Sequence, residues 1–361
     1  MDRIEKLNEI LTNINSNNYN VYLYVPSIPE NVYSMAVEEI YNVCFFLRKN
    51  NYNAFLITGE DEKEPEYKIP TFLSEEMKSL PHLSPRKDNI NVSVNDVLVV
   101  PEFFVNVMHQ ISEAKVQCER VVLCQSATYM LDSLPPNHTW AAWGFNTVLT
   151  TSEELKSFIQ RNSRVNYNIQ TYKIGIPDTF KPKKIKKPII MYFSRNDADI
   201  KKLSKIFFMK YPELSWVLFE RMQGAEPFIT RDKLAEKMGE IPVLLWLDKD
   251  AGFGTLPLEA MKSGAVVVGL IPEIDKDYTK KDDTAVWSNS LEVLAEQLGV
   301  IIKEWLVDNI PSVVYENMEK VSSEYTVENH EKTLVNAFSN IIETRKTLIN
   351  QIISNTKENE Q

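Results

Sequence analysis

The sequence predicts an α/β protein with two domains, each built on a parallel sheet. Short apolar runs alternate with segments of helical periodicity in both halves of the chain, the order typical of parallel α/β layers. A stretch rich in Pro and Lys interrupts this alternation at residues 173–187. The chain has 361 residues, which is long for one domain and sufficient for two that each bury a core.

The first half begins with a helix and continues as a strand–helix alternation. Ile4, Leu7, Ile10 and Ile14 recur at helical spacing, so residues 2–15 are expected to form an amphipathic helix. The next helices are predicted at 32–49 and 103–114, and the strands at 21–25, 53–58, 97–100, 121–124 and 147–149. A further helix, ending near residue 160, is expected to begin with Thr151 as N-cap and Glu154 completing a capping box.

Residues 173–187 are predicted to link a domain at 1–172 to a domain at 188–325. Apolar periodicity stops after Phe180, and prolines bracket a lysine cluster. The cluster consists of Lys181, Lys183, Lys184, Lys186 and Lys187. A solvated linker is the favoured interpretation, and contact with nucleic-acid phosphates is the alternative.

The second half alternates in the same way. Strands are predicted at 189–193, 216–219, 244–247, 265–268 and 285–288, and helices at 200–209, 233–238 and 291–307. From residue 313 the pattern is helical almost to the end.

The charge, the cysteine spacing and the length of the apolar runs argue against several classes of function. The net charge of −10 argues against a broad nucleic-acid footprint. Cys44, Cys118 and Cys124 have neither CxxC nor Cys/His metal spacing, which favours reduced thiols in a cytoplasmic protein and no metal site. We expect no signal peptide in the charged N-terminal segment, and no stable membrane insertion, because no apolar run is long enough.

The stretch 244–270 carries the strongest functional pattern. A buried strand leads into Gly252-Phe253-Gly254, Pro257 fits the first turn of a helix that contains Glu259, and Ser263-Gly264 ends it. A glycine loop that leads from the carboxyl end of a parallel strand into a helix is suited to binding an anion.

The run from Ala251 to Met261, AGFGTLPLEAM, resembles the signature of family 4 glycosyltransferases. In that family a glutamate stands at the place of Ala251. The resemblance implies the GT-B fold, in which two Rossmann-like domains face each other across a cleft. It also implies that the C-terminal helices, 326–361, cross back to pack on the first domain.

The same resemblance assigns the donor-binding residues. Arg195 follows a strand at the place of the family's pyrophosphate-binding arginine, Lys201 stands close to the place of its partner lysine, and Glu259 is expected to accept hydrogen bonds from the ribose hydroxyls. The residues of the glycine loop, Gly252, Phe253, Gly254, Thr255 and Leu256, complete the donor-binding set. Asp250 or Lys249 is expected to reach the donor sugar in place of the missing glutamate, and the alternatives are a different donor sugar or loss of transfer.

The implied reaction is retaining transfer of a hexosyl or pentosyl group from a nucleotide-diphosphate sugar, without a metal or other cofactor. The acceptor hydroxyl could belong to a glycan, a lipid-linked saccharide, a protein or a modified DNA base. Glu102 follows a strand and is the expected acceptor-side base. Two family features are missing, a glycine pair in 27–31 and a histidine at Pro101. The alternative is therefore a catalytically degenerate protein that serves as a nucleotide-binding scaffold.

Overall fold

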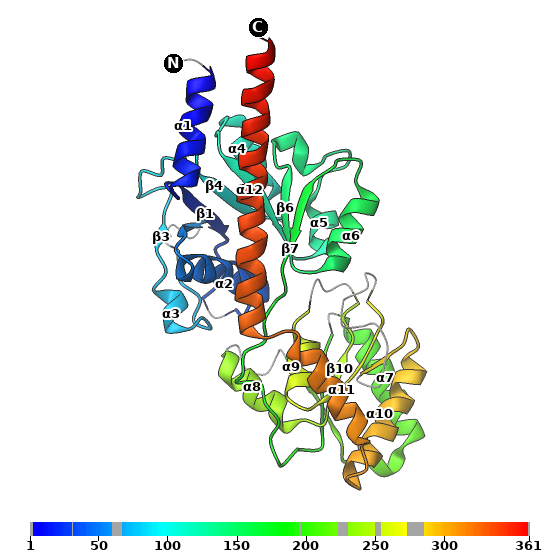
Figure 1. The fold of residues 1–361 in the computed structure, drawn as a ribbon. Helices are drawn as coiled ribbons and strands as arrows, with labels where there is room; N and C mark the ends of the chain where they lie inside the picture. The colour runs from blue at the N-terminus through cyan, green and yellow to red at the C-terminus, as the bar shows by residue number, and fades with distance from the viewer. Residues whose placement is uncertain are drawn as a thin grey trace. The chain divides into compact units, whose positions relative to one another are not determined.

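A computed structural model of the chain describes residues 3–30, 32–59, 67–194, 196–222, 230–249, 254–272 and 285–359 (Figure 1). Its contacts divide the chain into two compact units. The first unit comprises Met1–Tyr172 and Glu331–Gln361, and the second Lys173–His330.

The first unit is built on a seven-stranded sheet whose strand order is β3-β2-β1-β4-β5-β6-β7. Its strands are β1 (Asn20–Val25), β2 (Asn53–Thr58), β3 (His82–Leu83), β4 (Val97–Pro101), β5 (Glu119–Cys124), β6 (Thr147–Thr150) and β7 (Asn168–Thr171), and all their pairings are parallel. Chain order reverses between β1 and β4, which makes their carboxyl ends the place where such a sheet binds ligands.

Helix α1 (Arg3–Asn15) precedes the first strand of this sheet, and the other helices before β7 lie between its strands in the chain. They are α2 (Met35–Lys49), α3 (Glu75–Lys78), α4 (Val105–Glu113), α5 (Ala127–Ser133), the short 3₁₀ helix η1 (Trp140–Trp143) and α6 (Glu153–Asn162). Trp140, Trp143 and Phe145, an aromatic cluster in the sequence, are buried in the core of this unit.

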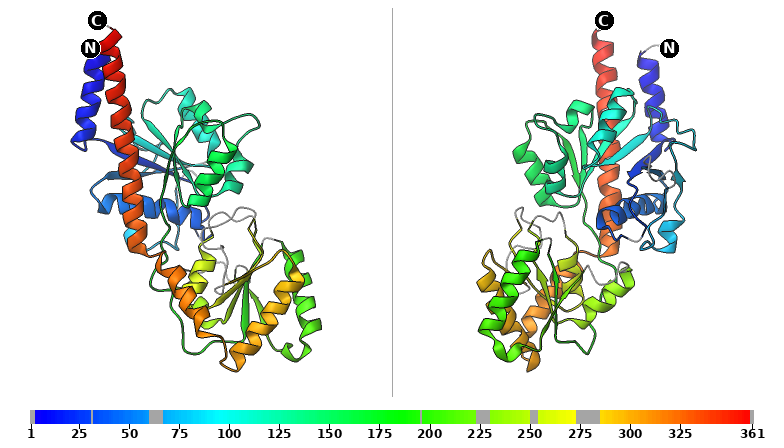
Figure 2. Two further views of the ribbon diagram at one scale, coloured as in Figure 1. Left: turned by 45° about the vertical axis from the view of Figure 1, so that its right-hand side comes forward. Right: turned by 180° about the vertical axis from the view of Figure 1, so that it is seen from behind.

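The long helix α12 (Val327–Asn359) returns to the first unit from Glu331 onward, as the GT-B resemblance implied (Figure 2). Lys49 forms an ion pair with Glu331, and the buried Arg345 donates hydrogen bonds to the carbonyl oxygens of Val94, Asn95 and Asp96. The guanidinium group therefore fixes α12 to the segment that leads into β4.

The second unit contains a five-stranded sheet of order β12-β11-β10-β8-β9, again with parallel pairings throughout. Its strands are β8 (Ile189–Phe193), β9 (Leu218–Arg221), β10 (Val243–Trp246), β11 (Val266–Gly269) and β12 (Ala285–Trp287). β10 and β11 are buried along their whole length, as expected for central strands covered on both faces.

Helices α7 (Asp197–Lys210) and α10 (Leu291–Leu306) pack together on one face of this sheet. Helices α8 (Arg231–Glu240), α9 (Leu256–Lys262) and α11 (Ser312–Ser323) lie together on the other, and the short 3₁₀ helix η2 (Pro212–Leu214) follows α7. Among the residues described, no helix is both long and apolar enough to cross a bilayer.

Two local expectations are wrong. The N-cap of α6 is Ser152, whose Oγ accepts a hydrogen bond from the backbone N–H of Leu155 at 3.1 Å, and not Thr151. The strand predicted at 216–219 is found at Leu218–Arg221, because η2 and the turn after it occupy the preceding residues.

The lysine-rich segment is docked on the second unit and is not a fully solvated linker. Lys183 and Lys187 pair with Glu240 at the end of α8. Lys186 Nζ donates to the carbonyl oxygens of Gly239, Ile241 and Ser263, at 3.3, 2.9 and 3.2 Å, and its burial lowers the pKa of the amine to about 8. These carbonyls lie at the C-terminal ends of α8 and α9, where the helix dipole favours a cation.

Candidate functional site

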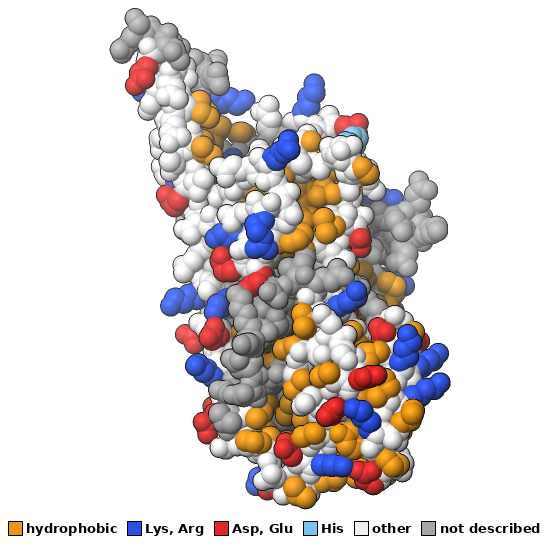
Figure 3. All heavy atoms as spheres, turned by 90° about the vertical axis from the view of Figure 1, so that its right-hand side faces the viewer, with side chains coloured by type: hydrophobic (Ala, Val, Ile, Leu, Met, Phe, Trp, Pro, Cys, Tyr) orange, Lys and Arg blue, Asp and Glu red, His pale blue; other side chains and the backbone are white. Residues whose placement is uncertain are grey.

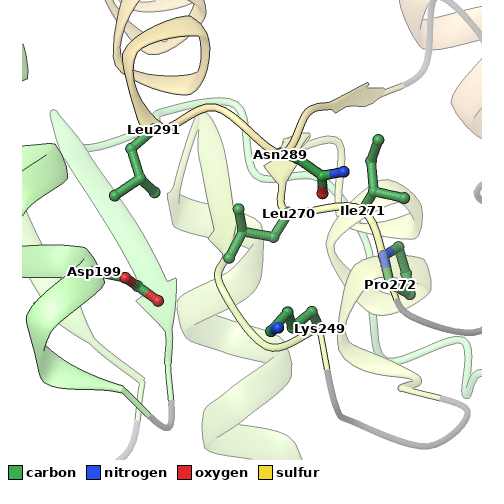
Figure 4. Close-up of a pocket in the computed structure, with 7 residues that line it drawn as sticks. All are labelled: Asp199, Lys249, Leu270, Ile271, Pro272, Asn289 and Leu291. Atoms are coloured by element: carbon green, nitrogen blue, oxygen red, sulfur yellow. The ribbon is translucent and has the colours of Figure 1, made fainter.

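The candidate site lies at the carboxyl edge of the second sheet. Chain order reverses there between β8 and β10, and a pocket of about 640 Å³ opens beside the ends of β10, β11 and β12 (Figure 4). The carboxyl ends of parallel strands meet at one edge, so residues far apart in the sequence contribute to this pocket together.

The pocket walls combine apolar and polar groups (Figure 4). Leu270, Ile271 and Pro272 follow β11, while Asn289 and Leu291 come from the turn into α10. Asp199 in the first turn of α7 and Lys249 after β10 are the charged lining residues. Apolar walls with a few polar groups suit a flat ring with hydrogen-bonding edges.

The strand ends below the pocket are closely packed. Trp246 at the end of β10 stacks on Phe193 at the end of β8, with ring centroids 5.0 Å apart and planes at 16°. Gly269 ends β11, and a Cβ there would lie 2.7 Å from the carbonyl oxygen of Trp246 and 2.8 Å from the Trp287 ring. Only glycine fits this position without displacing its neighbours.

Glu259 lies in α9 and has no solvent-exposed surface. Its Oε1 atom accepts hydrogen bonds from the Thr255 hydroxyl at 2.7 Å and from Arg231 Nη1 at 2.5 Å. Its Oε2 atom is buried and has no hydrogen-bond partner among the described residues. A buried acceptor without a donor costs free energy, so this oxygen is a candidate ligand-binding atom.

The start and end of α9 follow the sequence prediction closely. The helix begins at Leu256 with Pro257 in its first turn and ends at Lys262. Ser263 is its C-cap, and Gly264 follows with φ +70°. Gly254, Thr255 and Leu256 are buried at its start. The local sequence therefore places Glu259 one turn into a helix that follows the glycine loop.

The other residues predicted to bind the nucleotide sugar divide into two groups. Arg195, Asp250, Gly252 and Phe253, together with the substituted position Ala251, lie outside the described residues. Lys201 is exposed on α7, next to the buried Ile200. The described part of the predicted site thus consists of Gly254, Thr255, Leu256 and Glu259, with Lys201 on a separate element.

Glu102 lies in the first unit, directly after β4, and is completely buried. Its Oε1 accepts hydrogen bonds from the backbone N–H groups of Gln125 and Ser126, at 3.1 and 2.9 Å, and its Oε2 has no hydrogen-bond partner among the described residues. Burial raises the pKa of Glu102 to about 8, because the two N–H donors offset only part of the lost hydration.

Sequence reasoning did not find Arg231, the ion-pair partner of Glu259. Arginine at the start of an amphipathic helix ordinarily indicates a solvated face, and the sequence gives no signal that this residue meets a carboxylate in α9. No group of three or more His, Cys, Asp or Glu side chains suited to a metal ion occurs among the described residues.

Comparison with known proteins identifies the architecture. No protein-family model matches the sequence. The chain is 21% identical over 314 residues to an alpha-1,6-glucosyltransferase of Actinobacillus pleuropneumoniae serotype 7, a match that covers 82% of this chain and 88% of the relative.

Two solved structures extend the comparison to the fold. Anabaena HepE in complex with UDP and glucose matches with a TM-score of 0.61 at 13% identity, covering 89% of this chain and 99% of that one. Sucrose-phosphate synthase from Thermosynechococcus elongatus matches with a TM-score of 0.53 at 11% identity, covering 93% and 99%. With its two parallel sheets and its returning C-terminal helix, the chain has the GT-B fold of glycosyltransferases.

Proposed function

We propose that the protein is a retaining glycosyltransferase, a diverged relative of family 4, that transfers a hexose from a uridine-diphosphate sugar to a saccharide hydroxyl. The observation that carries this proposal is the buried Glu259, whose Oε2 has no donor among the described residues, in the helix after a glycine loop. The similarity to an alpha-1,6-glucosyltransferase and to a structure solved with UDP and glucose favours these substrates.

In this proposal the nucleotide spans the carboxyl edge of the second sheet. The base occupies the pocket, between the apolar side chains of Leu270, Pro272 and Leu291 and the amide of Asn289. Glu259 accepts hydrogen bonds from the ribose. Residues expected to bind the diphosphate are Arg195, Lys201, Gly252, Phe253, Gly254, Thr255 and Leu256.

Transfer then proceeds with retention of configuration and without a metal ion. The glycosidic bond to the diphosphate breaks as the acceptor hydroxyl attacks from the same face, and the departing phosphate takes the proton of that hydroxyl. Arg195 and the backbone N–H groups of the loop stabilise the charge that develops on the phosphate. Asp250, next to Ala251, contacts the donor sugar.

Glu102 is not the acceptor's base in this scheme. Burial raises the pKa of Glu102 to about 8, so its carboxyl group is mainly protonated at pH 7. A protonated carboxyl group cannot take a further proton from an acceptor hydroxyl. We therefore propose a structural role for Glu102 in place of the one expected from the sequence. Its carboxyl group accepts hydrogen bonds from the backbone N–H groups of Gln125 and Ser126, which precede α5.

A DNA acceptor has little support. The nucleic-acid alternative depended on the lysine cluster, and Lys183, Lys186 and Lys187 are bound to acidic side chains or carbonyl oxygens of the second unit. On the face shown in Figure 3, the basic side chains of the described residues are interspersed with acidic ones and form no continuous basic surface.

A donor screen tests the proposal and separates it from the scaffold alternative. UDP-glucose, UDP-galactose and GDP-mannose are incubated with the protein, with and without glucosides as acceptors, and released nucleotide is measured. We expect UDP release from a UDP-hexose, increased by acceptor and reduced at least about tenfold in Glu259→Gln. The matched control is Glu236→Gln, which removes an exposed carboxylate on α8 that pairs with Lys183. Nucleotide binding without release from any donor would support the scaffold and contradict the enzyme.

A further inference from the structure

The carboxylate of Glu259 is held by one of its two oxygens. Both donors found for it, Arg231 Nη1 and the Thr255 hydroxyl, bind Oε1. Oε2 receives no hydrogen bond from the described residues, although the side chain is fully buried. Two donors on one oxygen fix the rotation of the carboxylate and leave the other oxygen in a defined direction.

Arg231 is itself held in place. It is the first residue of α8, after the Thr230 cap whose Oγ1 accepts from the Lys233 N–H, and its side chain is only 16% exposed. Its guanidinium carbon lies 5.0 Å from the centroid of the Phe180 ring, within cation–π range, and Phe180 is buried. The arginine is therefore fixed between the 173–187 segment and α9.

We propose that Arg231 is a positioning residue for ribose recognition. Its positive charge neutralises the buried carboxylate of Glu259. It also orients that carboxylate so that Oε2 accepts a hydrogen bond from a ribose hydroxyl of the nucleotide sugar. This inference rests on the proposed function, because it assigns a specific task within the same nucleotide site.

A purely structural ion pair would behave differently from a positioning one. Loss of a structural pair lowers the stability of the second unit and weakens the binding of every nucleotide alike. Loss of a positioning pair weakens the binding of nucleotides that contact Glu259 and leaves the affinity for other nucleotides unchanged. UDP and 2′,3′-dideoxy-UDP separate the two cases, because they share base and diphosphate and differ only in the hydroxyls that Glu259 would bind.

The experiment is calorimetric titration of both nucleotides into wild type, Arg231→Gln, Arg231→Lys and Lys237→Gln. Lys237 is the matched control, a cation on the same helix that pairs with Glu220 of β9. For Arg231→Gln we expect UDP affinity to fall about tenfold and dideoxy-UDP affinity to stay within about twofold of wild type. The reason is that the variant loses only the charge-assisted hydrogen bond between Glu259 and the ribose hydroxyls. Arg231→Lys should recover part of the loss, and Lys237→Gln should match wild type.

Equal loss for both nucleotides in Arg231→Gln, or unchanged preference for UDP, would overturn the positioning role while leaving nucleotide binding intact. Absence of UDP binding by wild type would overturn the proposed function together with this inference. Circular dichroism and melting temperature check folding. If Arg231→Gln is unfolded, Thr255→Val gives a second test, because it removes the other hydrogen-bond donor to Oε1 of Glu259. This variant should also reduce the ratio of UDP affinity to dideoxy-UDP affinity.

Discussion

The backbone N–H of Ser126 donates a hydrogen bond of 2.9 Å to Oε1 of Glu102, across the gap between the ends of β4 and β5. Together with the N–H of Gln125 it gives the buried carboxyl two donors on one oxygen and none on the other among the described residues. This arrangement suits a protonated acid, and burial accordingly raises the pKa of Glu102 to about 8.

Glu102→Gln should remove a pH dependence of stability. The folded-state pKa is raised above the unfolded value, so the stability that Glu102 contributes is complete below pH 4.5 and is lost as pH rises toward 8. Wild type should therefore lose up to about 1.4 kcal/mol per pH unit relative to the variant within this window. Urea unfolding at pH 5, 6.5 and 8 measures the difference.

The same variant tests whether Glu102 acts as a base. Gln is close in shape to a protonated Glu and keeps an oxygen for the N–H groups of Gln125 and Ser126, so we expect transfer activity at pH 7 within about threefold of wild type. A loss of more than about a hundredfold, with the protein folded, would restore the catalytic role that the sequence suggested.

Lys186→Met should destabilise the second unit by about 1–3 kcal/mol. The substitution leaves the carbonyl oxygens of Gly239, Ile241 and Ser263 without their shared donor and removes a cation from two helix C-termini. Lys184→Met is the control, because Lys184 is exposed in the same segment. Chemical denaturation compares the two variants, and equal midpoints would show that the capping contacts add no net stability.

Arg345→Met should destabilise the first unit by about 2–4 kcal/mol. The guanidinium is the donor that joins α12 to the carbonyl oxygens of Val94, Asn95 and Asp96, and burial makes the loss of these bonds costly. Lys346→Met removes a neighbouring cation whose partner is the exposed Glu343 and should change stability by less than about 0.5 kcal/mol. The urea midpoint is the measurement, and a similar small effect for both variants would contradict the anchoring role of Arg345.

Apolar runs bounded by breakers made several strands predictable to the residue, including β2 at 53–58 and β8 at 189–193. The edge strand β7, with the sequence NIQT, was missed because an edge needs no continuous apolar run. Helix α5 was missed because seven residues are too short to show a helical period.

The candidate site was predictable only where a local motif defined it. The glycine loop and the Pro at the helix start placed Glu259 correctly in α9. Arg231 could not be found, because its pairing with Glu259 depends on how α8 packs beside α9. The burial of Glu102 was equally hidden, since a glutamate after a strand end is ordinarily solvated.

The central claim is that Glu259 binds the ribose of a uridine-diphosphate donor, and UDP titration into wild type and Glu259→Ala by isothermal calorimetry tests it most directly. We expect saturable binding to wild type and a loss of affinity of at least about tenfold in the variant, because the ribose loses a charge-assisted acceptor. Equal UDP affinity for the two proteins, or no binding to either, would contradict this assignment.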